Sequence, residues 1–144
     1  MNSPVSELLE SKGCELYTVP ETATVHQAVQ QMIDARVGSV LVVDGDALVG
    51  IFTERDVLVR VVGANRDPMK TPVSFVMTHD PVSVDSSTTV QEVIEQHSGK
   101  EFRHVPVVDN GKLIGMVSMR DILRWIAPPS GVPQGAHAGF EQRD

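Results

Sequence analysis

Apolar residues follow two periodicities along this chain, one typical of helices and one typical of buried strands. Between residues 24 and 36 they recur every three or four positions and share one face of a predicted helix. The second such segment begins at Val90 and continues with Val93 and Ile94 before it becomes polar at His97. The runs SVLVVD, from Ser39, and HVPVVD, from His104, are short and continuously apolar, which predicts buried strands.

Around these segments the pattern predicts a complete unit that occurs twice. Short extended segments at 16–19 and 82–84 precede the helices, and the turns GDA and NGK follow the apolar strands, Asn-Gly being a strong hairpin signal. LVGIFT and LIGMVS are the predicted return strands, and ERDVLVRVV and MRDILRWI are predicted helices with one apolar face. The predicted fold is therefore α/β (α+β), with the element order β-α-β-β-α in each of two units.

The two units are related by a shift of 65 residues. Residues 16–61 then lie over residues 81–126 without a gap, and 13 of the 46 pairs are identical, where average composition would give about three. Repeats of this kind decide the fold, because each is one supersecondary unit. We expect one repeat at 9–64, a polar linker at 65–72, a second repeat at 73–126 and a disordered Pro-, Gly- and Ala-rich tail at 127–144.

Composition and charge narrow the class of protein. The chain has 144 residues, 41% of them hydrophobic, a formal net charge of -7 and no run of Lys or Arg, so a nucleic-acid partner is not expected. No stretch approaches the roughly 20 consecutive apolar residues of a membrane span. Cys14 is the single cysteine, and the N-terminal residues lack the features of a secretory signal, so we expect a reducing, cytoplasmic location.

The motif GIFTERD, at 50–56, returns as GMVSMRD at 115–121 and allows two interpretations. In the structural one, Thr53 and Ser118 cap the helices that follow, with Asp56 and Asp121 completing capping boxes. In the functional one, the same helix start offers N–H donors to a phosphate, and the aspartate accepts the two hydroxyls of a ribose. The two interpretations are compatible with each other.

With its internal repeat, its VxVVD strands and its paired endings VLVVDGDALVGIFTERD and VPVVDNGKLIGMVSMRD, the chain resembles a tandem pair of cystathionine β-synthase (CBS) domains, often called a Bateman module. The resemblance covers about residues 9–126. It implies two β-α-β-β-α repeats packed with pseudo-twofold symmetry, and a stand-alone module that dimerises into a flat disc through its second helices. It also implies a cleft between the repeats that binds an adenosine-containing ligand such as AMP, ADP, ATP, S-adenosylmethionine or NAD(H).

Carrying the family pattern onto this sequence predicts two unequal sites. Site A would combine phosphate and ribose contacts from the second repeat with an adenine wall from the first: Ser118, Arg120, Asp121, Arg103, His104, Tyr17, Val19, Val37 and Gly38. Site B would be its counterpart: Thr53, Arg55, Asp56, Ser39, Pro81, Val82, Val84, Phe102 and Arg103. We expect the better phosphate grip in site A, because Arg103 and His104 occupy positions that hold Gly38 and Ser39 in the first repeat.

Several alternatives stay open at this point. His104 is equally compatible with an ordinary surface histidine and with a ligand contact. Arg55 and Arg120 are equally compatible with solvated charges on a helix and with contacts to a phosphate. The histidines lack metal-ligand spacing, and no nucleophile motif or acid–base pair indicates an enzyme. The leading hypothesis is a regulatory ligand-sensing module that acts on an unidentified regulated protein; the alternative is a structural interaction module with vestigial clefts.

Overall fold

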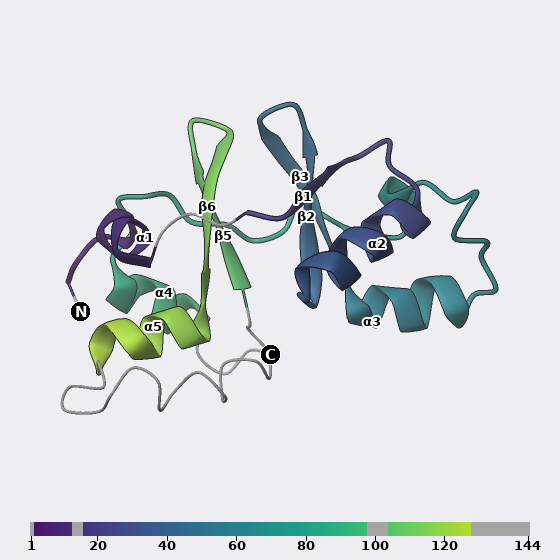
Figure 1. The fold of residues 1–144 in the computed structure, drawn as a ribbon. Coiled ribbons are helices and arrows are strands. Elements are labelled where there is room, and N and C mark those ends of the chain that lie inside the picture. The colour runs from purple at the N-terminus through teal and green to yellow at the C-terminus, as the bar shows by residue number, and fades with distance from the viewer. Residues whose placement is uncertain (1, 13–15, 98–103, 128–144) are drawn as a thin grey trace.

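The computed structural model describes residues 2–12, 16–97 and 104–127 (Figure 1). One β-sheet has the strand order β1-β2-β3-β4, in which β4 comes from the start of the second repeat and pairs with β3 of the first, and the second repeat also contains the hairpin β5-β6. The elements run α1 (Val5–Lys12), β1 (Thr18–Pro20), α2 (Val25–Ala35), β2 (Ser39–Asp44), β3 (Ala47–Thr53), α3 (Glu54–Asp56), η1 (Val57–Val62), η2 (Val73–Phe75), β4 (Thr78–His79), α4 (Val90–Gln96), β5 (His104–Asp109), β6 (Lys112–Ser118) and α5 (Met119–Ile126).

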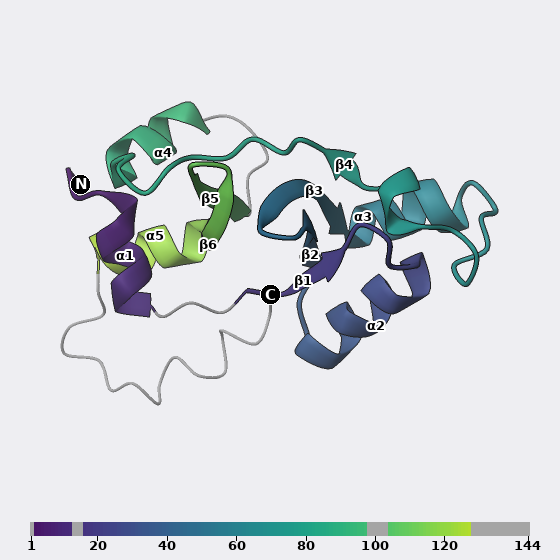
Figure 2. The same ribbon diagram turned by 90° about the horizontal axis from the view of Figure 1, so that it is seen from above.

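The two halves meet through their hairpins. Figures 1 and 2 show β2-β3 and β5-β6 side by side at the centre, with α2 and α3 on one outer side and α1, α4 and α5 on the other. Near the tips the Leu113 N–H donates a 2.9 Å hydrogen bond to the Asp46 carbonyl, so the turn of the first hairpin is joined directly to β6. The predicted α+β fold of two related units is confirmed.

Both hairpins turn where the sequence predicts tight turns, after Asp44 and after Asp109. Asp109 pairs with Lys112 across Asn110 and Gly111, which have φ values of 52° and 79°. Positive φ at both central residues is what a type I′ turn requires, and Asn-Gly meets that requirement at low cost. A shift in register lies at the equivalent place within each apolar strand, between Val42 and Val43 in β2 and between Val107 and Val108 in β5. The two repeats therefore share even this irregularity of strand pairing.

Each half has its own core of β-branched residues. The core of the first half is built around Phe52, Val40 and Val42, and that of the second around Val105, Val107 and Ile122, all nearly or fully inaccessible to water. Residues of this type suit strands that are buried on both faces. Most of the apolar faces predicted for α2 and α4 lies in these cores, with Val25, Ala28 and Met32 buried in the first and Val90 and Val93 in the second. Ile33, at the end of the predicted face of α2, is instead 59% exposed.

The leading segment of each half packs against the other half. α1, which precedes the first repeat, lies in the second core through Val5 and Leu8, and its Val5 N–H donates to the Thr88 carbonyl. Reciprocally, the linker before the second repeat accepts hydrogen bonds from α2, with Val25 N–H donating to the Thr71 carbonyl at 2.8 Å. This exchange ties the halves together by chain segments as well as by their hairpins.

Three features of the structure differ from the sequence-based expectations. α1 was not predicted, although it begins at Val5 and contributes to a core. The expected strand at 82–84 is limited to an isolated bridge between Val84 and Val107. The helix predicted from ERDVLVRVV is α only at its start and then becomes the π-helix η1, closed by Gly63 N–H donating to the Leu58 carbonyl. Four valines in those six residues have little χ1 freedom against an α-turn, which weakens the α-helical preference.

Candidate functional site

The repeated motif forms the same hydrogen-bonded cap in both halves. In the first half the Asp56 N–H donates to Thr53 Oγ1 at 3.2 Å, and Thr53 N–H donates back to Asp56 Oδ2 at 2.9 Å. In the second half the corresponding distances between Asp121 and Ser118 are 3.1 and 2.9 Å. Both are complete capping boxes, with Asp in the position where Glu or Gln is usual. The capping interpretation of the motif is confirmed.

The surroundings of the two aspartates are different. Asp56 is buried, with 7% of its surface exposed. Its Oδ2 also accepts a hydrogen bond from Thr53 Oγ1 at 3.1 Å, and its Oδ1 lies 3.7 Å from Arg60 Nε. Arg60 is held in turn by hydrogen bonds from its Nη1 to the carbonyls of Val76 and Met77, at 3.2 and 3.0 Å. Both carboxylate oxygens of Asp56 are thus engaged inside the first half.

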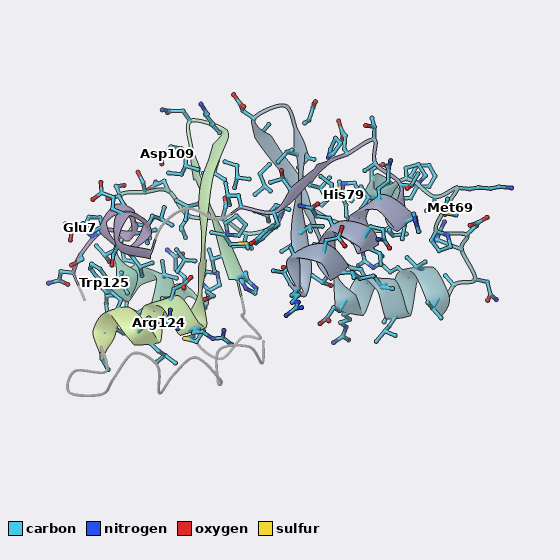
Figure 3. All side chains as sticks on the ribbon, viewed as in Figure 1. Glu7, Met69, His79, Asp109, Arg124 and Trp125 are labelled. Atoms are coloured by element: carbon cyan, nitrogen blue, oxygen red, sulfur yellow. The ribbon has the colours of Figure 1, made fainter. Side chains whose placement is uncertain are left out.

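Asp121, in contrast, is half-buried and lines a pocket. This pocket, about 290 Å³ in volume, lies between α1 and α5 and is bounded by Leu8, Ser11, Asp121, Arg124 and Trp125. Figure 3 labels Arg124 and Trp125 on α5, next to α1. A carboxylate, a guanidinium, a hydroxyl and an indole ring therefore surround one space, which is a mixture suited to a polar ligand with an aromatic part.

The strand register places further predicted residues beside each cap. His104 is the cross-strand partner of Ser118, and Ser39 is that of Thr53. Gly38 also lies at the cap of its own half, because its carbonyl accepts a 3.0 Å hydrogen bond from Glu54 N–H. The structure therefore brings together the strand start and the helix start within each half, while the assignment of Gly38 to site A stays a prediction.

The residues predicted to line the adenine differ from one another in how deeply they are buried. Val19 and Val84 are buried in the first and second cores, and Tyr17 and Val37 are partly buried against the first. Val82, by contrast, is 70% exposed, and Pro81 before it is half-buried. Arg55 and Arg120 are exposed on the first turns of α3 and α5. Phe102 and Arg103 lie outside the described residues, so their roles stay predictions.

Sequence reasoning missed the residues that distinguish the two caps. Arg60 was not a candidate, nor were Leu8 and Ser11 on α1 or Arg124 and Trp125 on α5. One signal was available: at the 65-residue offset Arg60 corresponds to Trp125, a non-conservative pair four residues after each aspartate. Side chains four apart on a helix are neighbours, so this pair marks a difference beside the motif.

Comparison with known proteins identifies the family. The family model of the CBS domain matches the chain twice, over residues 5–63 and 73–128. The chain belongs to the CBS domain family. It carries a tandem CBS pair, and the resemblance inferred from the repeated motif is thereby confirmed.

Relatives of this CBS pair include single modules and parts of larger proteins. The CBS domain-containing protein CBSCBSPB5 of Arabidopsis thaliana is 38% identical over 111 residues, covering 76% of this chain. The present chain spans only about a fifth of the length of the Arabidopsis relatives that it matches (20% for CBSCBSPB5). A CBS-domain containing protein from Agrobacterium tumefaciens is 33% identical with a TM-score of 0.75, covering 86% of this chain and 99% of its own.

A third relative was solved with a nucleotide. A CBS domain protein from Pyrobaculum aerophilum, complexed with AMP, is 30% identical with a TM-score of 0.71, covering 83% of this chain and 89% of its own. Within the described part of the present chain, no group of three or more His, Cys, Asp or Glu side chains is arranged to hold a metal ion. Nor does that part contain a helix with the length and apolar character needed to cross a membrane.

Proposed function

We propose that this CBS pair is a regulatory module that senses an adenosine nucleotide (AMP, ADP, ATP or NAD(H)) at the Asp121 cap, and that it is not an enzyme. The observation that carries the proposal is the position of Asp121, which caps α5 and also lines the pocket between α1 and α5. A carboxylate at that place can accept both vicinal hydroxyls of a ribose. The AMP complex of the Pyrobaculum relative supports this choice of ligand class.

The pocket residues suit the other parts of such a ligand. The Trp125 indole offers a face for stacking an adenine ring, and Arg124 offers a charged donor to a phosphate. The first turn of α5 adds backbone N–H groups and the positive end of the helix dipole. Arg120 on that turn and His104 opposite Ser118 are the predicted additional phosphate contacts.

We further propose that the module acts as a homodimer and that nucleotide binding to it controls a regulated protein. Leu58, Val59 and Val62 on the first-half helix and Leu123 and Ile126 on α5 are exposed apolar residues. Figure 1 shows these two helices along the same side of the molecule. Apolar residues gathered on one side of a small protein are typical of an interface. Ligand-dependent regulation then requires that the nucleotide bind two arrangements of this dimer with different affinity.

Calorimetric titration tests the nucleotide proposal. Freshly purified protein is titrated with AMP, ADP, ATP, NAD, NADH and S-adenosylmethionine, and we expect saturable binding of at least one of the first five. Asp121→Ala should weaken that binding by more than tenfold, which corresponds to 1.4 kcal/mol. Asp34→Ala, at an exposed position of α2, is the matched control and should bind like the wild type.

Three results would count against parts of this proposal. Absence of binding for every nucleotide would favour the structural interaction module. Unchanged affinity in Asp121→Ala would place the nucleotide elsewhere. Conversion of ATP or NADH during incubation with the purified protein would show an enzyme, contrary to the proposal. A melting curve for each variant separates lost binding from lost folding.

A further inference from the structure

We propose that α1, which precedes the first repeat, forms one side of the nucleotide pocket of the second half, so that a bound nucleotide holds α1 in its docked position. This inference rests on the nucleotide-binding function proposed above and deepens it, because it adds Ser11 and the docking of α1 to the ligand site. It follows from two observations. α1 packs in the second core, and both Leu8 and Ser11 of α1 line the pocket.

The beginning of α1 is docked by backbone hydrogen bonds to the segment before α4. Val5 N–H donates to the Thr88 carbonyl at 2.8 Å. In the opposite direction, Val90 N–H at the start of α4 donates to the Ser3 carbonyl at 2.9 Å. These bonds fix where α1 begins, and the rest of the helix depends on its side chains for its position.

The side chains that anchor α1 lie in its middle. Leu8 is 2% exposed in the second core, and Leu9 packs against Gly115 of β6. Ser11, beyond these two anchors, is exposed. Figure 2 shows α1 beside α5, with which it is in contact. The end of α1 that carries Ser11 is therefore placed next to α5 by anchors one turn earlier in the helix.

The pocket is bounded by both helices. Leu8 and Ser11 form its α1 side, and Asp121, Arg124 and Trp125 form its α5 side. Its volume of about 290 Å³ is near the lower end of the range for ligand pockets, which is about 300–1,000 Å³. A displaced α1 would take one side of this small pocket away. A ligand between the helices is therefore enclosed only while α1 is docked.

Ligand binding and the docking of α1 are then coupled. A helix of eight residues is marginal in water without tertiary contacts, so α1 depends on its docking. A ligand that touches both helices binds the docked state more tightly than the undocked state and shifts the equilibrium toward docking. If it binds the docked state alone, it stabilises that state about a hundredfold at 100 times its Kd.

Hydrogen–deuterium exchange of the full chain tests this coupling. Exchange in peptides from residues 5–12 is followed by mass spectrometry without nucleotide and with AMP or ATP, at about 100 times the Kd from calorimetry. We expect exchange in α1 to slow at least tenfold. α2, on the opposite outer side of the molecule, is the internal control and should slow much less (Figure 1). Saturable binding with α1 slowed no more than α2 would overturn the inference and leave nucleotide sensing intact.

A bulky side chain at position 11 tests the α1 side of the pocket directly. Ser11→Trp places an indole where the ligand would contact α1, so the affinity for AMP or ATP should fall more than tenfold. Glu10→Trp is the matched control. Glu10 is exposed on α1 as Ser11 is, but it is not among the described residues that line the pocket. This control should bind like the wild type.

The possible failures can be told apart. Wild-type affinity in a folded Ser11→Trp would show that the nucleotide does not contact α1. Should the melting curve show that Ser11→Trp does not fold, Ser11→Gln is the second variant and should weaken binding severalfold; unchanged affinity there would equally overturn the inference. Absence of nucleotide binding by the wild type would instead remove the proposed function, and this inference with it.

Discussion

Leu9 of α1 packs so closely on Gly115 of β6 that a Cβ built at position 115 would lie 2.9 Å from both Leu9 methyl carbons. The equivalent glycine of the first half, Gly50, is faced by the side chain of Met77. Leu9 lies in the segment at the start of the first repeat, and Met77 lies in the segment at the start of the second. In both places, therefore, a glycine of one repeat leaves room for the segment at the start of the other repeat. The two glycines at the start of the repeated motif are thus positions where the halves are held together.

We expect Gly115→Ala to lower the free energy of unfolding. The added methyl group must displace Leu9 or shift α1, and overpacking of this kind typically costs about 1–3 kcal/mol. Urea denaturation followed by circular dichroism measures the change. Leu9→Ala in the same chain makes room for the methyl group, so the double variant should be more stable than the sum of the two single losses predicts. Simple additivity would mean that Leu9 is not what the added methyl group meets.

The two caps should also differ in their contribution to stability. Asp56→Ala removes an N3 carboxylate that is buried and faces Arg60, and leaving such partners unsatisfied costs about 1–3 kcal/mol. Asp121→Ala removes a half-buried carboxylate with the same capping bonds, for which about 1 kcal/mol is expected. Urea titrations of both variants compare them. In an Arg60→Met background the loss caused by Asp56→Ala should become smaller; a loss that stays the same would mean that Arg60 does not contribute to it.

Asp85 provides a pH-dependent test of the turn on which α1 docks. The hydroxyl groups of Ser87 and Thr88 donate to its carboxylate, and these bonds lower the pKa of Asp85 below its usual 3.8. The Asp85 carboxylate also accepts hydrogen bonds from the backbone N–H groups of Ser87 and Thr88, and these bonds hold the turn. The Thr88 carbonyl of the same turn accepts a hydrogen bond from Val5 N–H of α1. A carboxyl with a depressed folded-state pKa stabilises the fold above pH 3.8 and loses that effect as the pH falls through the folded value.

The expected result is therefore a difference between wild type and Asp85→Asn that depends on pH. Above about pH 5 the wild type should be the more stable protein. As the pH falls below 3.8 and through the lowered folded-state pKa of Asp85, the difference should shrink steadily, because the carboxylate becomes protonated and is then neutral like the asparagine side chain. Thermal unfolding of both proteins from pH 2.5 to 7 measures it, with Asp80→Asn as an exposed carboxyl control. A difference that does not change with pH would show that the Asp85 charge has no part in the turn.

Most of the fold was predictable because its signals are local. The apolar stripe of α2, the runs of β2 and β5 and the turn Asn110-Gly111 each specify an element within a few residues. α1 escaped prediction because it has only eight residues and its stabilising partners lie more than 75 positions away, for example Thr88. A helix that short is marginal without tertiary contacts, so its sequence alone carries little signal.

The candidate site was also predictable only where its features are local in sequence. The 65-residue offset identified Asp56 and Asp121 as equivalent caps, and the structure confirms both as N3 partners of Thr53 and Ser118. The different surroundings of the two caps depend on contacts between distant segments: Arg60 with the carbonyls of residues 76 and 77, and α1 with α5. A comparison of the repeats shows that Arg60 and Trp125 differ, but only the fold shows what each one touches.

The exposed apolar residues on the helices that follow the two caps should form the dimer interface. Leu58 is 67% exposed and Leu123 is 59% exposed. We expect light scattering after size exclusion to give the mass of a dimer for the wild type and of a monomer for Leu58→Asp combined with Leu123→Asp, because two charges would be buried without partners. Ile33→Asp is the matched control: it is 59% exposed but lies on α2. It should remain dimeric, and a monomeric Ile33→Asp would move the interface to α2.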